Sequence, residues 1–453
     1  MKRKPVLLLL GVMMLLCGCM PSQAETENLM RPPRPSGEKA EIQQVIEAHA
    51  GENVVLKYPR SGDYRSAIIT CDVNGDKKDE AFAFYQPKSS STSGTHFVFM
   101  DQFQEEWRVV SEHVIDSDEI DRILVRDLTG TGQKEIVIGW DTYSDTKIME
   151  VYDYRNNTLR QLMPEQCLYT DICVGDFDQD GNDELLTVSQ NGSTQSAQAR
   201  LFKMRQGDLE QISTIGLDQN VSGYANIKAG VVNRDGQYGV VLDGYKGNSS
   251  MITELVYYDN QAGRLMVPSK DREAIQDLAL RSTVTVSRDI NNDGIVEIPF
   301  VTRRTFSIAL GEKVQTDYTV WKCFDVKNNT FYNVTSMFIN YNDGYYLTVP
   351  DEWVEKVYIS TDVARKTTTF YQMAPIVLEN NLETDGNKAS SPYFDKLLQI
   401  KAVTQNEWEW MQQEGYQKIT EKDGTVYVAM VSEQKSLAMS ISQLQQNFTL
   451  IAG

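Results

Sequence analysis

Histidine is scarce in this chain, which has three among 453 residues, and the spacings typical of common catalytic centres are missing. The sequence contains no G-x-S-x-G, no phosphate-binding Gly-Lys loop and no H-E-x-x-H. Serine hydrolase, P-loop and zinc-protease chemistry therefore have no support in it. The three histidines, His49, His96 and His113, are expected at a helix end and in two strands. No catalytic residue is predicted.

Positive charge is also in deficit, with 44 Lys and Arg against 63 Asp and Glu and a formal net charge of −19. A surface this acidic repels nucleic acid and anionic lipid headgroups, so no nucleic-acid partner is expected. Long apolar runs are equally rare. The exception is Val6–Leu16, which follows Lys2, Arg3 and Lys4. This arrangement is typical of a secretory signal and is too short to span a bilayer stably.

The apolar run ends in Leu16-Cys17-Gly18-Cys19, which resembles a bacterial lipobox. The resemblance implies that residues 1–18 are a signal peptide cleaved before Cys19, and that the Cys19 sulfur carries lipid. Each buried CH₂ of an acyl chain contributes about 0.8 kcal/mol, so two or three chains anchor a protein stably. Cleavage removes three basic residues and lowers the net charge from −19 to −22. The alternative is an ordinary signal peptide with incidental cysteines.

Proline-rich sequence follows the lipobox, and residues 19–40 are expected to form a semi-extended tether. The chain would then be attached to the cell membrane at its extracytoplasmic face, and would contact the membrane through the lipid anchor only. That compartment permits disulfides, but four cysteines allow three pairings, and buried free thiols are an equal alternative. The cysteines concerned are Cys71, Cys167, Cys173 and Cys323.

An acidic turn of about ten residues recurs along the chain, and each copy runs into an apolar, strand-like segment. The clearest copies begin at Asp176 and Asp289, and a third, at Asp72, lacks only a glycine at its sixth position. Two eroded copies begin at Asp127 and Val231. A recurrence at about fifty residues is typical of a solenoid, a propeller or an array.

The chemistry of the turn favours calcium. Oxygen-bearing side chains at the first, third and fifth positions of a tight loop converge on one small space, and Ca²⁺ takes six to eight such ligands. An EF-hand would need a bidentate glutamate at position 12, where the best copy has Thr187, and flanking helices. Here the acidic residue is at position 9, and Leu185-Leu186-Thr187-Val188 follows as an apparent buried strand.

This pattern, D-x-[DN]-x-[DN]-G-x-x-[DE] before an apolar run, resembles the FG-GAP/VCBS repeats of integrin-type β-propellers. The resemblance implies structural Ca²⁺ at three loops, with the ligands Asp176, Asp178, Asp180 and Glu184, then Asp289, Asn291, Asp293 and Glu297, then Asp72, Asn74, Asp76 and Glu80. The second copy has Thr129 and Thr131 at ligand positions, and the fourth has Val231 and Gly239, so both are expected to be metal-free. The alternative is that all five loops are hydrogen-bonded turns without metal.

Each period contains four strand-like runs, the signature of a propeller blade. We expect a mainly β chain in which residues 41–340 form a β-propeller of about five four-stranded blades, with six or seven possible. An open β-solenoid is the rival architecture. Asn53–Tyr58 is a candidate for the strand that completes the last blade. The strands expected in the best three periods are 123–127, 135–140, 147–154 and 158–163; 171–176, 184–190, 197–204 and 209–217; and 283–290, 296–303, 316–326 and 331–339.

After residue 340 the pattern changes, and residues 341–453 are expected to form a small α+β domain. Strands are predicted at 357–361, 367–371, 396–403 and 425–432, and helices at 407–413 and 436–448. Three of the six tryptophans, Trp353, Trp408 and Trp410, are concentrated here. They could stack on sugar or anchor a partner, although a core position is the commoner role.

These features indicate a lipid-anchored extracytoplasmic module that binds a cell-surface protein or glycan and is not an enzyme. One alternative is an envelope carbohydrate-active enzyme that uses carboxylates on the loop face, since glycosidases need only two of them. A structural part of a larger envelope assembly is another.

Overall fold

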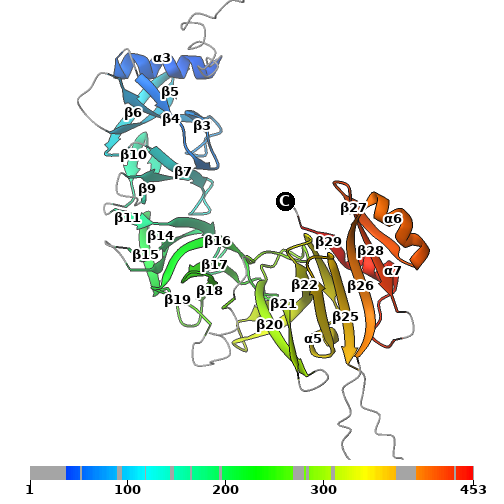
Figure 1. Ribbon diagram of the computed structural model, residues 1–453. Coiled ribbons are helices and arrows are strands. Elements are labelled where there is room, and N and C mark those ends of the chain that lie inside the picture. Colours follow the sequence, from blue (N-terminus) through cyan, green and yellow to red (C-terminus); the bar gives the residue numbers. More distant parts are fainter. Residues whose placement is uncertain are drawn as a thin grey trace, which may run out of the picture. The chain divides into compact units, whose positions relative to one another are not determined.

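The chain is mainly β, as expected, and its strands form several sheets (Figure 1). The computed structural model describes residues 37–51, 54–88, 94–117, 119–142, 147–163, 166–192, 196–268, 280–281, 285–307, 312–373, 394–432 and 435–451. The predicted signal peptide, Cys19 and most of the tether lie outside the described residues. None of the helices within these ranges has both the length and the apolar character needed to cross a membrane.

The chain divides into two compact units, and the division passes through strands β7 to β10. Unit 1 comprises Met1–Leu124, Trp140–Tyr143 and Tyr154–Arg160, and unit 2 comprises Val125–Gly139, Ser144–Asp153 and Gln161–Gly453. The strands of this region are β7 (Glu119–Arg126), β8 (Glu135–Asp141), β9 (Lys147–Arg155), β10 (Thr158–Gln161) and β11 (Cys167–Tyr169). All four strands predicted for the second period are therefore present. Asn156 and Asn157 have φ of 52° and 58°, as a tight hairpin between β9 and β10 requires.

Unit 1 begins with helix α3 (Glu38–Ala50). Ile42 and Ile46, one turn apart, are fully buried against the first sheet, whose core includes Ile68, Val98 and Trp107. The sheet has the order β1-β4-β5-β6, and β3 also pairs with β4. Its strands are β1 (Val54–Lys57), β3 (Ile68–Cys71), β4 (Glu80–Pro87), β5 (Thr95–Phe103) and β6 (Glu106–Ile115). The short strand β2 (Ser61–Gly62) pairs parallel with β7 in the second sheet.

The N-terminal strand completes the first sheet, so its predicted place in the last blade is wrong. Strand β1 pairs antiparallel with β4, with Leu56 opposite Tyr85. Strand β3 pairs with the other half of β4, with Ile69 opposite Phe82. Val54 and Leu56 pack against the same core that buries Ile42. Burial of this apolar surface explains why β1 joins the sheet of the strands that follow it in sequence.

Unit 2 contains two four-stranded antiparallel sheets whose strands follow one another in sequence order. Leu186 and Leu201 of the first share a core with Val240 and Val256 of the second. The strands of these sheets are β12 (Asp171–Gly175), β13 (Glu184–Ser189), β14 (Gln198–Arg205) and β15 (Asp208–Gly216), then β16 (Val221–Val231), β17 (Tyr238–Lys246), β18 (Ser250–Asp259) and β19 (Arg264–Met266). The strands predicted for the third period agree with β12 to β15 within about two residues at each end.

The next sheet has the order β20-β21-β22-β23-β29, so the end of the chain returns to it. Its strands are β20 (Ile298–Ser307), β21 (Lys313–Asp325), β22 (Thr330–Asn340), β23 (Tyr345–Val349) and β29 (Phe448–Leu450). The predicted domain boundary at residue 340 falls between β22 and β23, which are neighbours in this sheet. The predicted strand at 283–290 lies partly outside the described residues, and elsewhere contains a single bridge, Arg288 to Glu297.

The last sheet has the order β24-β25-β26-β28-β27. Three short helices occur in this part of the chain, and the first of them contacts β20 and β22 of the preceding sheet. The elements are α5 (Asp351–Lys356), β24 (Val357–Asp362), β25 (Thr367–Met373), β26 (Phe394–Thr404), α6 (Gln405–Met411), β27 (Gln417–Lys422), β28 (Thr425–Val431) and α7 (Ile441–Asn447). The predicted helix at 436–448 is shorter than expected, because the Ser440 side chain accepts a hydrogen bond from Gln443 and caps α7.

The three C-terminal tryptophans have different environments. Trp353 is fully buried, and its indole Nε1 donates to the carbonyl of Leu437 at 3.0 Å. Trp408 is partly buried against a small core, and Trp410 is 62% exposed. The four cysteines of the body are buried and are not joined in disulfides, which agrees with the alternative that they are small buried residues.

Candidate metal centre

The acidic loops share a hydrogen-bonding scheme that explains the positions of their first and ninth residues. The carboxylate of the first Asp caps backbone N–H groups later in its loop. Asp176 accepts from Asp180 and Gly181 at 3.0 Å, and Asp289 accepts from Asp293 and Gly294 at 3.1 and 2.9 Å. Asp72 and Asp127 cap their own loops in the same way.

The glutamate at the ninth position is buried and accepts a hydrogen bond from the backbone N–H of the second residue. Four loops have this bond, with donor–acceptor distances of 2.7 to 3.0 Å: Val73 to Glu80, Leu128 to Glu135, Phe177 to Glu184, and Ile290 to Glu297. A buried N–H without a partner is costly, so this glutamate has a structural role whether or not metal is bound. The sequence pattern revealed the position but not this role.

The fourth loop is built differently, because Gly239 occupies the ninth position. A Cβ there would lie 2.8 Å from the carbonyl oxygen of Val256, which leaves no room for a side chain. The N–H of Val232 donates instead to the carbonyl of Gln237, and the Asn233 side chain accepts from Asp235 and Gln237. This loop therefore satisfies its backbone without carboxylates.

The four loops of unit 2 lie next to one another in sequence order. A Cβ on Gly130 of the second loop would lie 2.1 Å from Asn182 Oδ1 of the third. The Gln179 amide of the third loop donates to the carbonyl of Gly236 in the fourth at 2.9 Å. Val296, the eighth residue of the fifth loop, donates from its backbone to Val231 at the start of the fourth. Equivalent turns thus occupy equivalent places in successive repeats.

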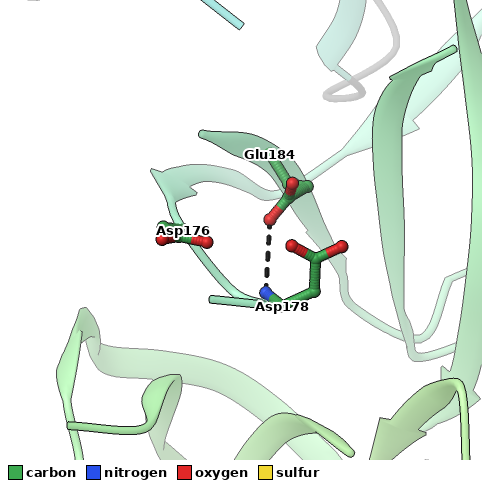
Figure 2. Close-up of side chains that lie close together, drawn as sticks. All are labelled: Asp176, Asp178 and Glu184. Carbon is green, nitrogen blue, oxygen red and sulfur yellow. Dashed lines mark hydrogen bonds between the residues drawn. The ribbon is translucent and has the colours of Figure 1, made fainter. Parts of the chain in front are cut away.

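The third loop brings three of its four predicted ligands together. One oxygen from each of Asp176, Asp178 and Glu184 lies within 4.8 Å of the others (Figure 2). This cluster already contains a cation. Lys203, from β14, places its ammonium 2.5 Å from Asp178, 2.6 Å from Asp180 and 2.9 Å from Glu184. Burial raises the pKa of Glu184 to about 7, although the hydrogen bond from Lys203 opposes the rise.

The fifth loop gathers carboxylates from its first, fifth and ninth positions, whereas the third loop gathers those of its first, third and ninth. One oxygen from each of Asp289, Asp293 and Glu297 lies within 4.8 Å of the others. Glu297 is fully buried, and its Oε1 has no hydrogen-bond partner. Burial raises the pKa of Glu297 to about 7, and the nearby charges of Asp293 and Asp289 add to the rise. Asn291 exchanges hydrogen bonds with Asp293 and so holds its side-chain oxygen beside the cluster.

The residues of the fifth loop therefore fit a calcium ion. Asp289, Asn291, Asp293 and Glu297 would hold it through oxygen atoms, the donors that Ca²⁺ prefers. A bound Ca²⁺ would neutralise the clustered carboxylates and give the unpaired Glu297 oxygen a partner. A carboxylate oxygen that accepts one hydrogen bond keeps a free lone pair, so the backbone caps on Asp289 do not prevent coordination.

The first loop does not gather its predicted ligands in this way. Asn74 donates from its amide nitrogen to Glu80 Oε1 at 2.7 Å, while its oxygen accepts from the backbone of Asp76. Among the described residues, Asp72, Asp76 and Glu80 do not bring one oxygen each within 4.8 Å of one another. Burial raises the pKa of Glu80 to about 7, and the nearby charge of Asp101 adds to the rise.

Two charged contacts of the structure were not predicted from the sequence. Lys203 was assigned only to a strand, and its contact with the third loop depends on a cross-strand register in which Leu185 pairs with Phe202. A lone lysine in the run Leu201-Phe202-Lys203-Met204 was the available signal. The second feature is a fully buried ion pair between Arg281 and Asp243, at 2.8 Å, which ties the segment after the fourth sheet to that sheet.

Comparisons with known proteins identify no family. The sequence matches no family profile and no curated protein.

Solved structures align weakly with this chain. A protein from Lactobacillus plantarum has 9% identity and a TM-score of 0.29, and the alignment covers 70% of this chain and 84% of that one. A rhamnogalacturonan lyase from Bacillus licheniformis has 12% identity and a TM-score of 0.28, with coverages of 71% and 73%. A hypothetical selenium-binding protein from Sulfolobus tokodaii has 8% identity and a TM-score of 0.30, with coverages of 67% and 70%. Similarity this low carries no functional conclusion.

Proposed function

We propose that the chain is a lipid-anchored binding module on the extracytoplasmic face of the cell membrane, built as a β-propeller of about five blades and stabilised by calcium. The observation that carries the calcium proposal is the buried, unpaired Oε1 of Glu297 beside Asp289 and Asp293. Calcium sites of extracellular modules have dissociation constants on the order of 10⁻⁴–10⁻³ M, so the site suits a calcium-rich exterior.

The propeller proposal rests on the repetition of antiparallel sheets and on the contacts between successive loops of unit 2. The third and fourth loops each join the first two strands of a sheet, β12 to β13 and β16 to β17. Closure of such sheets into a ring would protect their edge strands. The proposal predicts a compact molecule, which small-angle scattering of purified residues 20–453 would measure.

The binding role is favoured over catalysis by the placement of the titratable carboxyls. A glycosidase needs a general acid whose raised pKa allows protonation near neutral pH, in a position that reaches the substrate. Glu80, Glu184 and Glu297 have their pKa raised to about 7, but each is at most 1% exposed and bonds to its own loop. These groups are used to build the loops and cannot reach a polysaccharide.

The calcium proposal is tested by the melting temperature of residues 20–453 in millimolar calcium and in chelator. Binding to the folded state alone raises stability by mass action, so calcium should raise the melting temperature. The variant Asp293→Asn should lose most of this rise, whereas Asp317→Asn, an exposed aspartate in β21, should retain it. Equal melting curves for the unsubstituted protein in calcium and chelator would refute the proposal.

The anchor and the binding role need separate tests. Cys19→Ser should move the protein from the membrane fraction to the soluble fraction, while Cys17→Ser should remain membrane-bound. A glycan array and a pull-down from envelope extract would identify the partner class. Turnover of a cell-wall polysaccharide by the purified protein would replace the binding role with the enzymatic alternative.

A further inference from the structure

The third and fifth loops have nearly the same acidic sequence, but the neighbouring strand places a different residue opposite the ninth position of each loop. In the third repeat, Leu185 pairs with Phe202, so the neighbouring Glu184 faces Lys203. In the fifth repeat, Ile298 pairs with Lys322. One residue further along this antiparallel register, Glu297 faces Cys323. A lysine in one repeat thus corresponds to a cysteine in the other.

The Lys203 ammonium occupies the position that a metal ion would take in the third loop. Its three protons match three carboxylates, Asp178, Asp180 and Glu184, at 2.5 to 2.9 Å. Calcium–oxygen distances are about 2.3–2.6 Å, so an ion bound to the same oxygens would nearly coincide with Nζ. The Lys203 side chain is only 15% exposed, which indicates that it is packed into the site and is not a mobile surface group.

The fifth loop has no comparable internal cation. Among the described residues, no Lys or Arg forms an ion pair with Asp289, Asp293 or Glu297. Cys323 donates its thiol to the carbonyl of Val232 at 3.2 Å, and burial raises the pKa of this thiol, so it is neutral. Arg234, from the fourth loop, stacks over the Tyr332 ring with 4.7 Å between Cζ and the ring centroid. The carboxylates of the fifth loop are therefore left uncompensated.

We propose that Lys203 replaces calcium permanently in the third loop, and that Ca²⁺ binding among the unit 2 loops is confined to the fifth. This inference rests on the proposed calcium role and goes beyond it. The two loops match the sequence pattern equally well, but the third would be held by a lysine and the fifth by a metal ion. The clamp keeps the third loop folded where calcium is scarce, while the fifth loop responds to its concentration.

The test compares bound calcium per chain, by equilibrium dialysis at millimolar calcium, in variants of residues 20–453. Asp293→Asn should lose one ion relative to the unsubstituted protein. Asp180→Asn, the matched change in the third loop, should lose none. Lys203→Met should gain one ion, and its melting temperature should fall in chelator and recover in calcium.

The outcomes separate this inference from the proposal on which it rests. Loss of an ion in Asp180→Asn would show that calcium binds beside Lys203 and would overturn the inference, as would a folded Lys203→Met that gains no ion. A gain in Lys203→Met, with no ion lost in Asp293→Asn, would support the clamp and refute calcium in the fifth loop. If Lys203→Met does not fold, the comparison of Asp180→Asn with Asp293→Asn decides the question.

Discussion

The Oε2 atom of Glu135 accepts a hydrogen bond from the backbone N–H of Leu128 at 2.9 Å. This second loop has threonines at the third and fifth positions, where the third and fifth loops have predicted calcium ligands. Thr129 and Thr131 bond to each other through their hydroxyls at 2.7 Å. The buried glutamate is therefore present even where threonines stand at the predicted calcium-ligand positions. The glutamate at the ninth position thus satisfies a buried backbone N–H of the turn without metal, and metal binding depends on the other positions of the loop.

Removal of this glutamate should destabilise the fold without any dependence on calcium. Glu135→Ala leaves the buried N–H of Leu128 without its acceptor, which costs about 1–3 kcal/mol. Urea unfolding, followed by circular dichroism, would measure the free energy of unfolding in calcium and in chelator. Glu106→Ala, which changes a glutamate whose side chain is 73% exposed, should have little effect. A loss for Glu135→Ala that disappears in calcium would contradict this view.

Glycine at position 77 should stabilise the first loop. The sixth position is left-handed in every loop, with φ of 86° at Gly132, 93° at Gly181 and 85° at Gly294. Lys77 adopts φ 72° at the same position, and a side chain in this region costs about 1–2 kcal/mol. Lys77→Gly should therefore raise the free energy of unfolding by about 1 kcal/mol.

The control for this change is the adjacent residue. Lys78 is not among the residues with positive φ, so Lys78→Gly gains nothing and adds flexibility to the unfolded chain. It should lower stability slightly, although both substitutions remove one positive charge. Equal effects of the two variants would show that charge, and not backbone conformation, is responsible.

Most strands could be predicted from the sequence because their signals are local. Asn156-Asn157 marks a hairpin turn, and the apolar run after each acidic turn became a buried strand such as β13. Strand β27 was missed because it lies at the edge of its sheet and is polar, with Lys418, Glu421 and Lys422 on it. Polar edge strands lack the alternation on which prediction depends.

The features that were not predicted depend on contacts between distant residues. The position of Asn53–Tyr58 followed from an assumed ring closure, whereas its partner is determined by the apolar contacts of Val54 and Leu56. The acidic loops were recognised from spacing alone. The difference between the third loop, which faces Lys203, and the fifth, which faces Cys323, depends on which residue of the neighbouring strand lies opposite the ninth position. That strand register cannot be obtained from a single sequence.

The stability of the calcium-free protein should decrease as pH rises from about 4.5 to 7. Burial raises the pKa of Glu297 from 4.5 to about 7, so between these values the folded state holds a proton that the unfolded state has lost. The stabilisation is complete below pH 4.5 and is lost as pH rises through 7, an effect on the order of 3 kcal/mol at most. Glu80 and Glu184 change in the same direction.

Glu297→Gln isolates the contribution of this group, because the amide does not titrate. Its unfolding free energy in chelator should fall less steeply over this pH range than that of the unsubstituted protein. Calcium should also flatten the unsubstituted profile near pH 7, since the ion stabilises the carboxylate form. Parallel profiles for the two proteins in chelator would show that Glu297 is not the titrating group.

Breaking the buried ion pair of the fourth sheet should be among the most destabilising single changes in unit 2. Asp243 accepts from Arg281, from the Thr253 hydroxyl and from both the backbone and the hydroxyl of Ser287. Arg281→Met leaves a fully buried carboxylate with neutral donors only, at a cost of about 3–5 kcal/mol. The exposed pair of Arg303 and Asp317 offers a matched control, since Arg303→Met should cost below about 1 kcal/mol. Urea unfolding of the two variants would measure the difference, and similar losses would mean that Asp243 is compensated without its arginine.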